Sequence, residues 1–173
     1  DAVINFRHLF RFPDMVKSDG RELALVTLHR AETLADKVKL SEIISYLRNY
    51  SSKYQLIFPV HPNTMQHLKS YNIDTDFFTI IEPLVYTELQ GLLAEVSLVF
   101  TDSGGLQKEA YFHRKECITL REETEWVETI SSGWNVTWRG NRLNLKQDIT
   151  DYGVGKFCEN ALQIIQSFDA GEV

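Results

Sequence analysis

The chain has 173 residues, 43% apolar and 24% charged, which is ordinary for one globular domain with a sizeable core. Its formal net charge is −6 and it has no long basic block, which argues against a nucleic-acid partner. No apolar run approaches the roughly 20 residues of a membrane-spanning helix, and no signal-peptide pattern opens the chain, so a membrane partner is not expected.

The apolar pattern predicts a helix at the start and then strands that alternate with helices. The opening helix is expected over residues 3–10, ended near Pro13. Strands are expected at residues 23–27, 55–60, 78–81, 97–101, 117–120 and 134–137. Helices are expected around residues 40–47 and 89–93, with a closing helix over 157–168. This alternation predicts one α/β domain over residues 1–173, with a Rossmann-like parallel sheet covered by helices on both faces.

Polar side chains follow five successive predicted strands. They are, in chain order, His29 and Arg30, then His61, then Glu82, then residues 102–105, and finally Arg121 and Glu125. In parallel sheets ligands bind beyond the carboxyl ends of the strands. We therefore expect these groups to meet at one edge of the sheet and to form a site there.

The segment after the fourth of these strands is the most informative. Ser103, Gly104 and Gly105 join an apolar strand directly to helix-forming residues. The glycines let the backbone approach a ligand, and the N–H groups of a helix start suit a phosphate or pyrophosphate. Glu109 lies one helical turn further on and can accept hydrogen bonds from sugar hydroxyls. The alternative is a plain strand–helix turn with a capping side chain and a solvated Glu109.

The other candidates also have two interpretations. Arg30 offers several donors to phosphate oxygens and His29 can transfer a proton near neutral pH, unless both simply lie in a surface loop. His61 is either a ligand contact or a histidine satisfied at a strand end. Arg121 and Glu125 are expected to open the next helix, where charges also occur for reasons of the helix dipole alone.

The remaining motifs mainly exclude classes of site. Cys117 and Cys158 are far apart and no C-x-x-C is present, which is typical of free thiols in a reducing compartment and predicts a cytoplasmic protein. The five histidines show no metal-ligand spacing, so no metal site is predicted. Neither a G-x-G-x-x-G nor a phosphate-loop motif occurs, which argues against NAD or ATP binding by those routes.

Five motifs and a sixth, shorter one carry a resemblance to a known family. They are LVTLHRAE, FPVHPN, IIEPLVY, TDSGGLQKEA, ITLREETEWVET and a downstream SGWN, between about residues 25 and 135. In this order they resemble the carboxyl-terminal half of non-hydrolysing, bacterial-type UDP-N-acetylglucosamine 2-epimerases. TEWVE departs from the family's TERPE, with Trp126 in place of Arg, which leaves the exact amino sugar open.

The resemblance implies a two-domain architecture of the GT-B type, shared with many glycosyltransferases. This chain would be its UDP-binding domain, and the partner N-terminal domain would lie outside this sequence. The implied reaction eliminates UDP to leave a 2-acetamidoglucal and adds UDP back after inversion at C2, without a nicotinamide or metal cofactor. Because several acid–base carboxylates of the family belong to the other domain, we expect the isolated chain to be inactive. The implied partners are UDP, a UDP-N-acetylhexosamine and, for the full-length protein, a second copy of the same protein.

The resemblance also implies roles for individual residues. His29 would act in catalysis by stabilising the departing UDP, with Arg30 near the phosphates. Ser103, Gly104 and Gly105 would hold the diphosphate. Glu109 would accept the ribose hydroxyls.

The remaining implied roles concern the base, the sugar and regulation. Backbone groups of the bend from Glu82 to Leu84 would pair with uracil. Arg121 would reach phosphate, Glu125 would contact the sugar or the helix start, and His61 would lie beside a second, allosteric UDP-sugar. A GT-B glycosyltransferase donor domain and a non-catalytic nucleotide-sugar sensor are the alternative functions.

Overall fold

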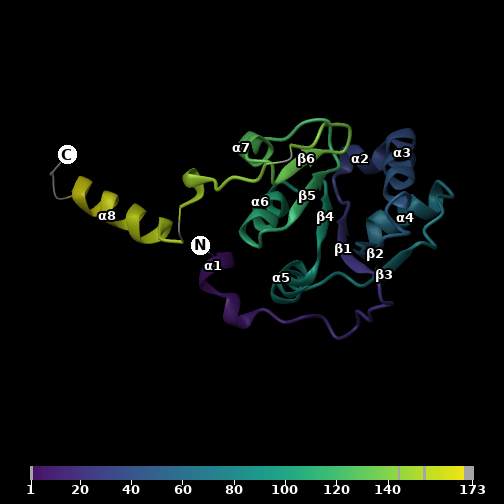
Figure 1. The fold of residues 1–173 in the computed structure, drawn as a ribbon, viewed down its shortest axis with the longest axis horizontal. Coiled ribbons are helices and arrows are strands. Elements are labelled where there is room, and N and C mark those ends of the chain that lie inside the picture. Colours follow the sequence, from purple (N-terminus) through teal and green to yellow (C-terminus); the bar gives the residue numbers. More distant parts are fainter. Residues whose placement is uncertain (1, 144, 154, 170–173) are drawn as a thin grey trace.

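The computed structural model describes residues 2–143, 145–153 and 155–169 of the chain. Among these residues, six strands form one parallel sheet in the order β3-β2-β1-β4-β5-β6 (Figure 1). They are β1 (Glu22–Thr27), β2 (Tyr54–Pro59), β3 (Phe78–Ile81), β4 (Leu98–Thr101), β5 (Glu116–Thr119) and β6 (Asn135–Thr137). Each lies within one residue of its predicted bounds at either end, so the predicted strands and the predicted parallel sheet are confirmed.

Helices precede, connect and follow the strands. They are α1 (Ala2–Asn5), α2 (Ala31–Ala35), α3 (Lys37–Arg48), α4 (Pro62–Ser70), α5 (Tyr86–Glu95), α6 (Gly104–Phe112), α7 (Val127–Ser131) and α8 (Phe157–Asp169), with short 3-10 helices η1 (Arg7–Leu9) and η2 (Thr150–Tyr152). Figure 1 shows α3 and α4 on one side of the sheet and α5 and α6 on the other. Helices therefore cover both faces, as the sequence predicts.

The sheet separates two apolar layers. Successive side chains of a strand point to opposite faces, so Ala24 and Val26 of β1 join one layer while Leu25 joins the other. The first layer includes Leu40 and Leu47 of α3, and the second packs against α5 and α6. Burial on both faces explains why the strands read as continuous apolar runs.

The chain changes direction across the sheet between β1 and β4. From β1 it proceeds outward through β2 and β3, then returns to pair β4 with the other side of β1 and continues through β5 and β6. The ends of the two central strands are joined by a hydrogen bond between the hydroxyls of Thr27 and Thr101, 2.6 Å apart. Ligands of doubly wound sheets bind at such a reversal of strand order.

The predicted opening helix over residues 3–10 is wrong as a continuous element. It divides into α1 and η1 at Phe6, which leaves helical geometry (φ −108°, ψ 17°). The chain then crosses α5, where the N–H of Arg11 donates to the carbonyl of Thr87 at 3.3 Å. A Cβ on Gly91 of α5 would lie 2.1 Å from the Arg11 carbonyl oxygen, so this close crossing requires a glycine.

The predicted closing helix exists as α8, but it does not close the core. It extends away from the rest of the molecule (Figure 1), and the side chains of Leu162, Ile164 and Ile165 are each more than half exposed. Within the described ranges, no helix has both the length and the apolar character that crossing a membrane requires.

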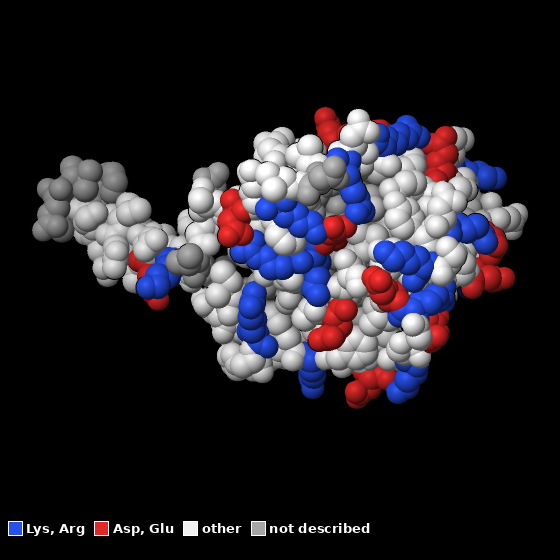
Figure 2. Space-filling model, viewed as in Figure 1, with Lys and Arg blue, Asp and Glu red and all other residues white. Residues whose placement is uncertain are grey.

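On the face seen in Figure 2, several Lys and Arg side chains gather left of centre with acidic side chains beside them, and the two signs are mixed elsewhere. Glu116, for example, accepts from both Arg142 (2.6 Å) and Lys146 (2.5 Å). Of the two cysteines, Cys117 is buried and Cys158 is exposed.

Candidate functional site

An open cavity of ≈ 350 Å³ lies at the carboxyl edge of the central strands. The carboxyl ends of strands and the segments after them line it: Thr27, Leu28 and His29 at the end of β1, Pro59 and His61 at the end of β2, Pro83 and Leu84 after β3, and Ser103, Gly105, Leu106 and Glu109 after β4, together with Tyr86 and Leu89 of α5. Predicted polar groups therefore line the cavity after three of the five strands, β1, β2 and β4, whereas the segment after β3 contributes only Pro83 and Leu84. Arg121 and Glu125, after the fifth, lie outside this lining.

The turn from β4 into α6 has the expected geometry. Ser103 is the N-cap of α6, and its hydroxyl oxygen accepts from the N–H of Leu106 at 3.5 Å. A Cβ added to Gly105 would meet no described atom within 4 Å, so the first turn of α6 is open to the cavity at this residue. A Cβ on Gly104 would instead lie 2.2 Å from an oxygen of Glu125, so Gly104 permits the close approach of that side chain. The helix start is thus both capped and open to an anion.

Asp102 organises the other side of the turn. It is completely buried, and it accepts from the backbone N–H groups of His29 (2.9 Å) and Arg30 (2.9 Å). The Nδ1 atom of His29 lies 3.1 Å from the same carboxylate. This hydrogen bond raises the pKa of His29, against an opposing contribution from burial. Asp102 therefore favours a protonated imidazole at the edge of the cavity.

Glu109 lies on the cavity wall, one turn into α6, as its spacing from Gly105 predicts. Its Oε2 accepts from Nε2 of the buried Gln90 at 2.8 Å, and the nearby Tyr86 hydroxyl also favours the ionised carboxylate. Burial raises the pKa of Glu109, while Gln90 and Tyr86 lower it. Gln90 in turn contacts His113, with 2.8 Å between Gln90 Oε1 and His113 Nε2.

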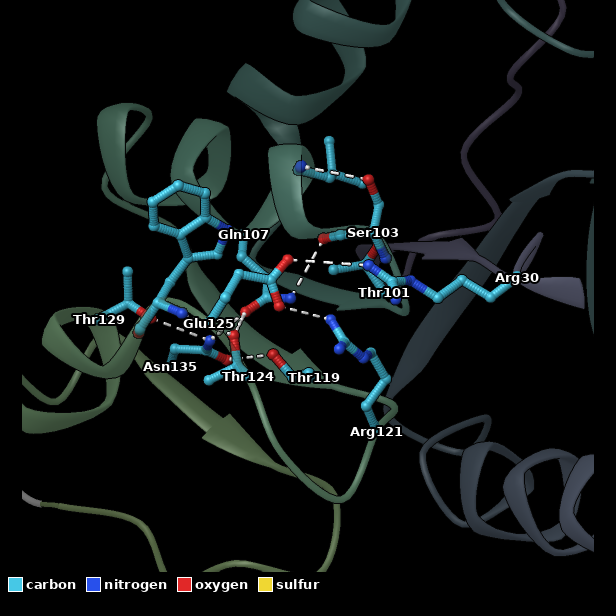
Figure 3. Close-up of polar contacts among 12 residues, drawn as sticks. Arg30, Thr101, Ser103, Gln107, Thr119, Arg121, Thr124, Glu125, Thr129 and Asn135 are labelled. Atoms are coloured by element: carbon cyan, nitrogen blue, oxygen red, sulfur yellow. Dashed lines mark hydrogen bonds and ion pairs between the residues drawn. The ribbon is translucent and has the colours of Figure 1, made fainter. Parts of the chain in front are cut away.

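Glu125 lies between two arginines beside the start of α6 (Figure 3). Its carboxylate contacts Arg121 at 2.7 Å and Arg30 at 3.7 Å. Its pKa is lowered by a backbone hydrogen bond and by Arg121. Arg121 and Glu125 do not open a helix as expected, because α7 begins only at Val127 and both residues lie in the preceding loop.

A buried glutamine holds that loop against α6. Gln107 donates through Nε2 to the carbonyl of Ser103 at 3.2 Å. Its Oε1 accepts from the Thr124 hydroxyl (2.6 Å) and from Asn135 Nδ2 (3.0 Å) (Figure 3). The Thr124 oxygen then accepts from the N–H of Trp126 at 3.1 Å. These bonds fix the loop in a non-helical path next to the turn.

The remaining predicted residues are divided between two cavities. Leu84 lines the candidate site, whereas Glu82 lines a neighbouring cavity of ≈ 510 Å³ together with Met15 and Met65. His61 lines the candidate site and is also the N-cap of α4, where its Nδ1 accepts from the N–H of Asn63 at 3.3 Å. Both interpretations of His61 are thus compatible with its position.

No group of three or more His, Cys, Asp or Glu side chains that could hold a metal ion occurs in the described part of the chain.

The sequence profile of the UDP-N-acetylglucosamine 2-epimerase family matches residues 5–166, which is nearly the whole chain. The chain belongs to this family. The resemblance noted in the motifs is therefore confirmed, and with it the Rossmann-like, GT-B-type half.

Individual members of the epimerase family show the extent of the match. The chain is 36% identical over 162 residues to a UDP-N-acetylglucosamine 2-epimerase homolog of Methanococcus maripaludis, covering 88% of this chain and 45% of that protein. It is 41% identical over 123 residues to a UDP-2,3-diacetamido-2,3-dideoxy-D-glucuronate 2-epimerase of Pseudomonas aeruginosa, covering 70% of this chain and 34% of that one.

A solved member of the family has the same fold. The Methanocaldococcus jannaschii UDP-GlcNAc 2-epimerase in complex with UDP-GlcNAc and UDP matches with a TM-score of 0.71 and 30% identity, over 96% of this chain and 48% of that one. The chain thus spans about half the length of the epimerases it matches or less.

The sequence interpretation missed several residues that shape the site. Gln90 and His113 were not singled out, although each lies four residues from another polar group of the same network, Tyr86 and Glu109 respectively. Side chains four apart on a helix share a face, which is the signal that was available. The pairing of Gln107 with the loop before α7 has no comparable local signal.

Proposed function

We propose that this chain is the UDP-binding domain of a UDP-N-acetylglucosamine 2-epimerase that interconverts UDP-GlcNAc and UDP-ManNAc. The observation that carries the proposal is the open first turn of α6 at Gly105, which shares one cavity with Ser103, Glu109 and His29. A diphosphate there would accept from backbone N–H groups at the positive end of the helix. Glu109 would accept the two ribose hydroxyls, since an ionised carboxylate has two acceptor oxygens.

His29 is the proposed catalytic residue of this half. Its hydrogen bond to Asp102 raises the pKa, so the protonated form persists to higher pH than for a free histidine. A proton on His29 would stabilise the negative charge that develops on UDP when the bond between the sugar C1 and the phosphate oxygen breaks. UDP leaves with the electron pair of that bond, and the proton of C2 goes to a base.

That base is proposed to belong to the partner N-terminal domain, together with other acid–base carboxylates. The present chain would hold UDP in place while the 2-acetamidoglucal takes a proton at C2 on its other face, so that UDP adds back at C1 rather than escaping. This division explains why we expect the isolated chain to bind UDP and to turn over nothing. In the cell we propose a cytoplasmic, homodimeric full-length enzyme.

The other candidate residues receive subsidiary roles. Arg30 and Arg121, which both contact Glu125, are proposed to reach the phosphates, with Glu125 near the sugar. Backbone groups between Glu82 and Leu84 are proposed to pair with uracil. His61 is proposed to contact a second, allosteric UDP-sugar.

Calorimetry with UDP and UDP-GlcNAc tests the assignment. We expect the wild-type protein to bind both, and Ser103→Ala and Glu109→Ala each to weaken binding about tenfold, as the loss of a hydrogen bond to a charged group predicts. Wild-type protein that binds neither nucleotide would end the proposal.

The match to a protein named as a UDP-2,3-diacetamido-2,3-dideoxy-D-glucuronate 2-epimerase favours a second candidate substrate of the same class. The proposed reaction is the same, because that sugar also carries an acetamido group at C2. Assays of the full-length protein with both nucleotide sugars, followed by NMR, distinguish them by which one is inverted at C2.

A further inference from the structure

The carboxylate proposed to bind ribose is held from behind by a buried amide. Gln90 of α5 is completely buried and donates through Nε2 to Glu109 Oε2 at 2.8 Å. The cavity of ≈ 350 Å³ is lined by Glu109 and not by Gln90, so the amide acts on the cavity only through the carboxylate. A buried amide bonded at both ends has one allowed orientation, because its donor and acceptor ends differ.

That orientation also fixes the proton on His113. An ionised Glu109 has no proton to donate, so the NH₂ group of Gln90 must face it. The carbonyl of Gln90 therefore faces His113 Nε2, 2.8 Å away, and this nitrogen must carry the hydrogen. The hydrogen bonds then run in one direction, from His113 through Gln90 to Glu109.

The surroundings keep His113 neutral. Burial lowers its pKa to about 4, and the cations Arg7 and Lys115 contribute in the same sense. Its ring lies 5.8 Å from the ring of Phe10, which comes from the N-terminal segment that crosses α5. The imidazole is thus packed as an uncharged donor away from the candidate site.

We propose that Gln90 and His113 are positioning residues that fix Glu109 in the orientation needed to accept two adjacent ribose hydroxyls, a role that rests on the proposed function. Tyr86, also on α5, lines the same cavity, and its hydroxyl favours the ionised form of Glu109. Holding the side chain in place before binding lowers the conformational entropy lost when the ribose binds.

The test compares the affinities for UDP and 2′-deoxy-UDP by calorimetry. Wild-type protein should prefer UDP about tenfold, since the deoxy ligand loses a hydrogen bond to a charged group. Gln90→Leu removes the support while keeping Glu109, and it should weaken UDP binding about five- to tenfold and largely abolish the preference. In a Glu109→Gln background, Gln90→Leu should not weaken UDP binding further, because the carboxylate that Gln90 positions is already gone.

His113→Leu should also reduce the preference for UDP over 2′-deoxy-UDP. His113→Gln keeps an N–H donor and should restore this preference. Gln55→Leu is the matched control for the loss of a buried glutamine. Gln55 is buried at the amino end of β2, where its Nε2 donates to the carbonyl of Lys17 (2.8 Å) and to the Thr79 hydroxyl (3.1 Å). This control should lower stability and leave the ribose preference unchanged.

Each negative result contradicts a different statement. If Glu109→Gln abolishes the preference while Gln90→Leu and His113→Leu retain it in full, the positioning role is wrong and the proposed function stands. If wild-type protein does not bind UDP, both are wrong. Should Gln90→Leu fail to fold, the pair His113→Leu and His113→Gln decides the question alone.

Discussion

At the scale of single residues, Asp102 links the two central strands at the point where the strand order reverses. A buried carboxylate is stable only when donors compensate its lost hydration. Here the donors are the N–H groups of His29 and Arg30, each at 2.9 Å, with the His29 ring 3.1 Å away. The same contacts that stabilise Asp102 therefore shape the loop after β1.

Replacing Asp102 by asparagine should lower the pKa of His29, because the main cause of its rise is the bond to that carboxylate. A raised folded pKa means that the folded state binds the proton more tightly than the unfolded state. This contribution to stability is complete below the unfolded value of 6.5 and is lost as pH rises through the folded pKa.

NMR titration of the His29 ring in both proteins measures the pKa directly. The free energy of unfolding of Asp102→Asn should also vary less with pH just above 6.5 than that of the wild type. A His29 pKa that is the same in the two proteins would contradict this account.

Residues of the candidate site could be predicted where their partners lie close to them in the sequence. Ser103, Gly105 and Glu109 follow one another within a single strand–turn–helix unit, so their spacing alone predicts that they share a cavity. Asp102 acquires its role from N–H groups after another strand. The spacing within α5 places Gln90 near Tyr86, but it does not reveal the bond from Gln90 to Glu109 of α6. The roles of the predicted ligand contacts remain predictions.

At the scale of elements, the strands were predictable and some boundaries were not. Strands buried on both faces leave an unmistakable apolar run, as in Leu98–Thr101, whose four residues are all buried and whose start was predicted to within one residue. The start of α7 at Val127 was missed because Thr124 bonds to Gln107 and to the N–H of Trp126, which holds the loop out of helical geometry. Such tertiary bonds override local helix signals.

Gly91→Ala should loosen the N-terminal segment from α5. The new methyl carbon would lie 2.1 Å from the backbone oxygen of Arg11, so one of the two backbones must move. We expect a loss of about 1–3 kcal/mol in the free energy of unfolding, typical of overpacking.

Hydrogen exchange at the N–H of Arg11, which donates to Thr87, should become faster in this variant. Gly105→Ala is the control, since a Cβ there meets no described atom within 4 Å. Equal exchange rates at Arg11 in Gly91→Ala and wild type would show that the crossing is not tight.

At the scale of the whole molecule, the described residues form a layered α/β fold with a candidate site at the edge of its sheet. It spans 45% of the Methanococcus maripaludis relative and 48% of the Methanocaldococcus jannaschii enzyme. The sheet and its two cores were readable from hydrophobic pattern. The position of α8 could not be predicted from this pattern, because its periodic apolar residues indicate a helix without indicating what they pack against.

Epimerisation in D₂O tests the proposed division of labour between domains. A base that removes the C2 proton of UDP-GlcNAc exchanges it with solvent, so an active enzyme introduces deuterium at C2. We expect the full-length protein to do so and the isolated 173-residue chain to leave the C2 proton in place. Deuterium at C2 with the isolated chain would show that the base lies within this domain.

The central claim is that the first turn of α6 receives the diphosphate of a UDP-sugar, and Gly105→Ala tests it most directly. Gly105 lines the cavity and a Cβ here meets no described protein atom within 4 Å, and alanine stabilises a helix relative to glycine by about 0.5–1 kcal/mol. We predict unchanged or higher thermal stability with UDP binding about tenfold weaker or worse, since a misplaced methyl costs about 1–3 kcal/mol. Equal UDP affinity in the two proteins, or none in either, would contradict the account.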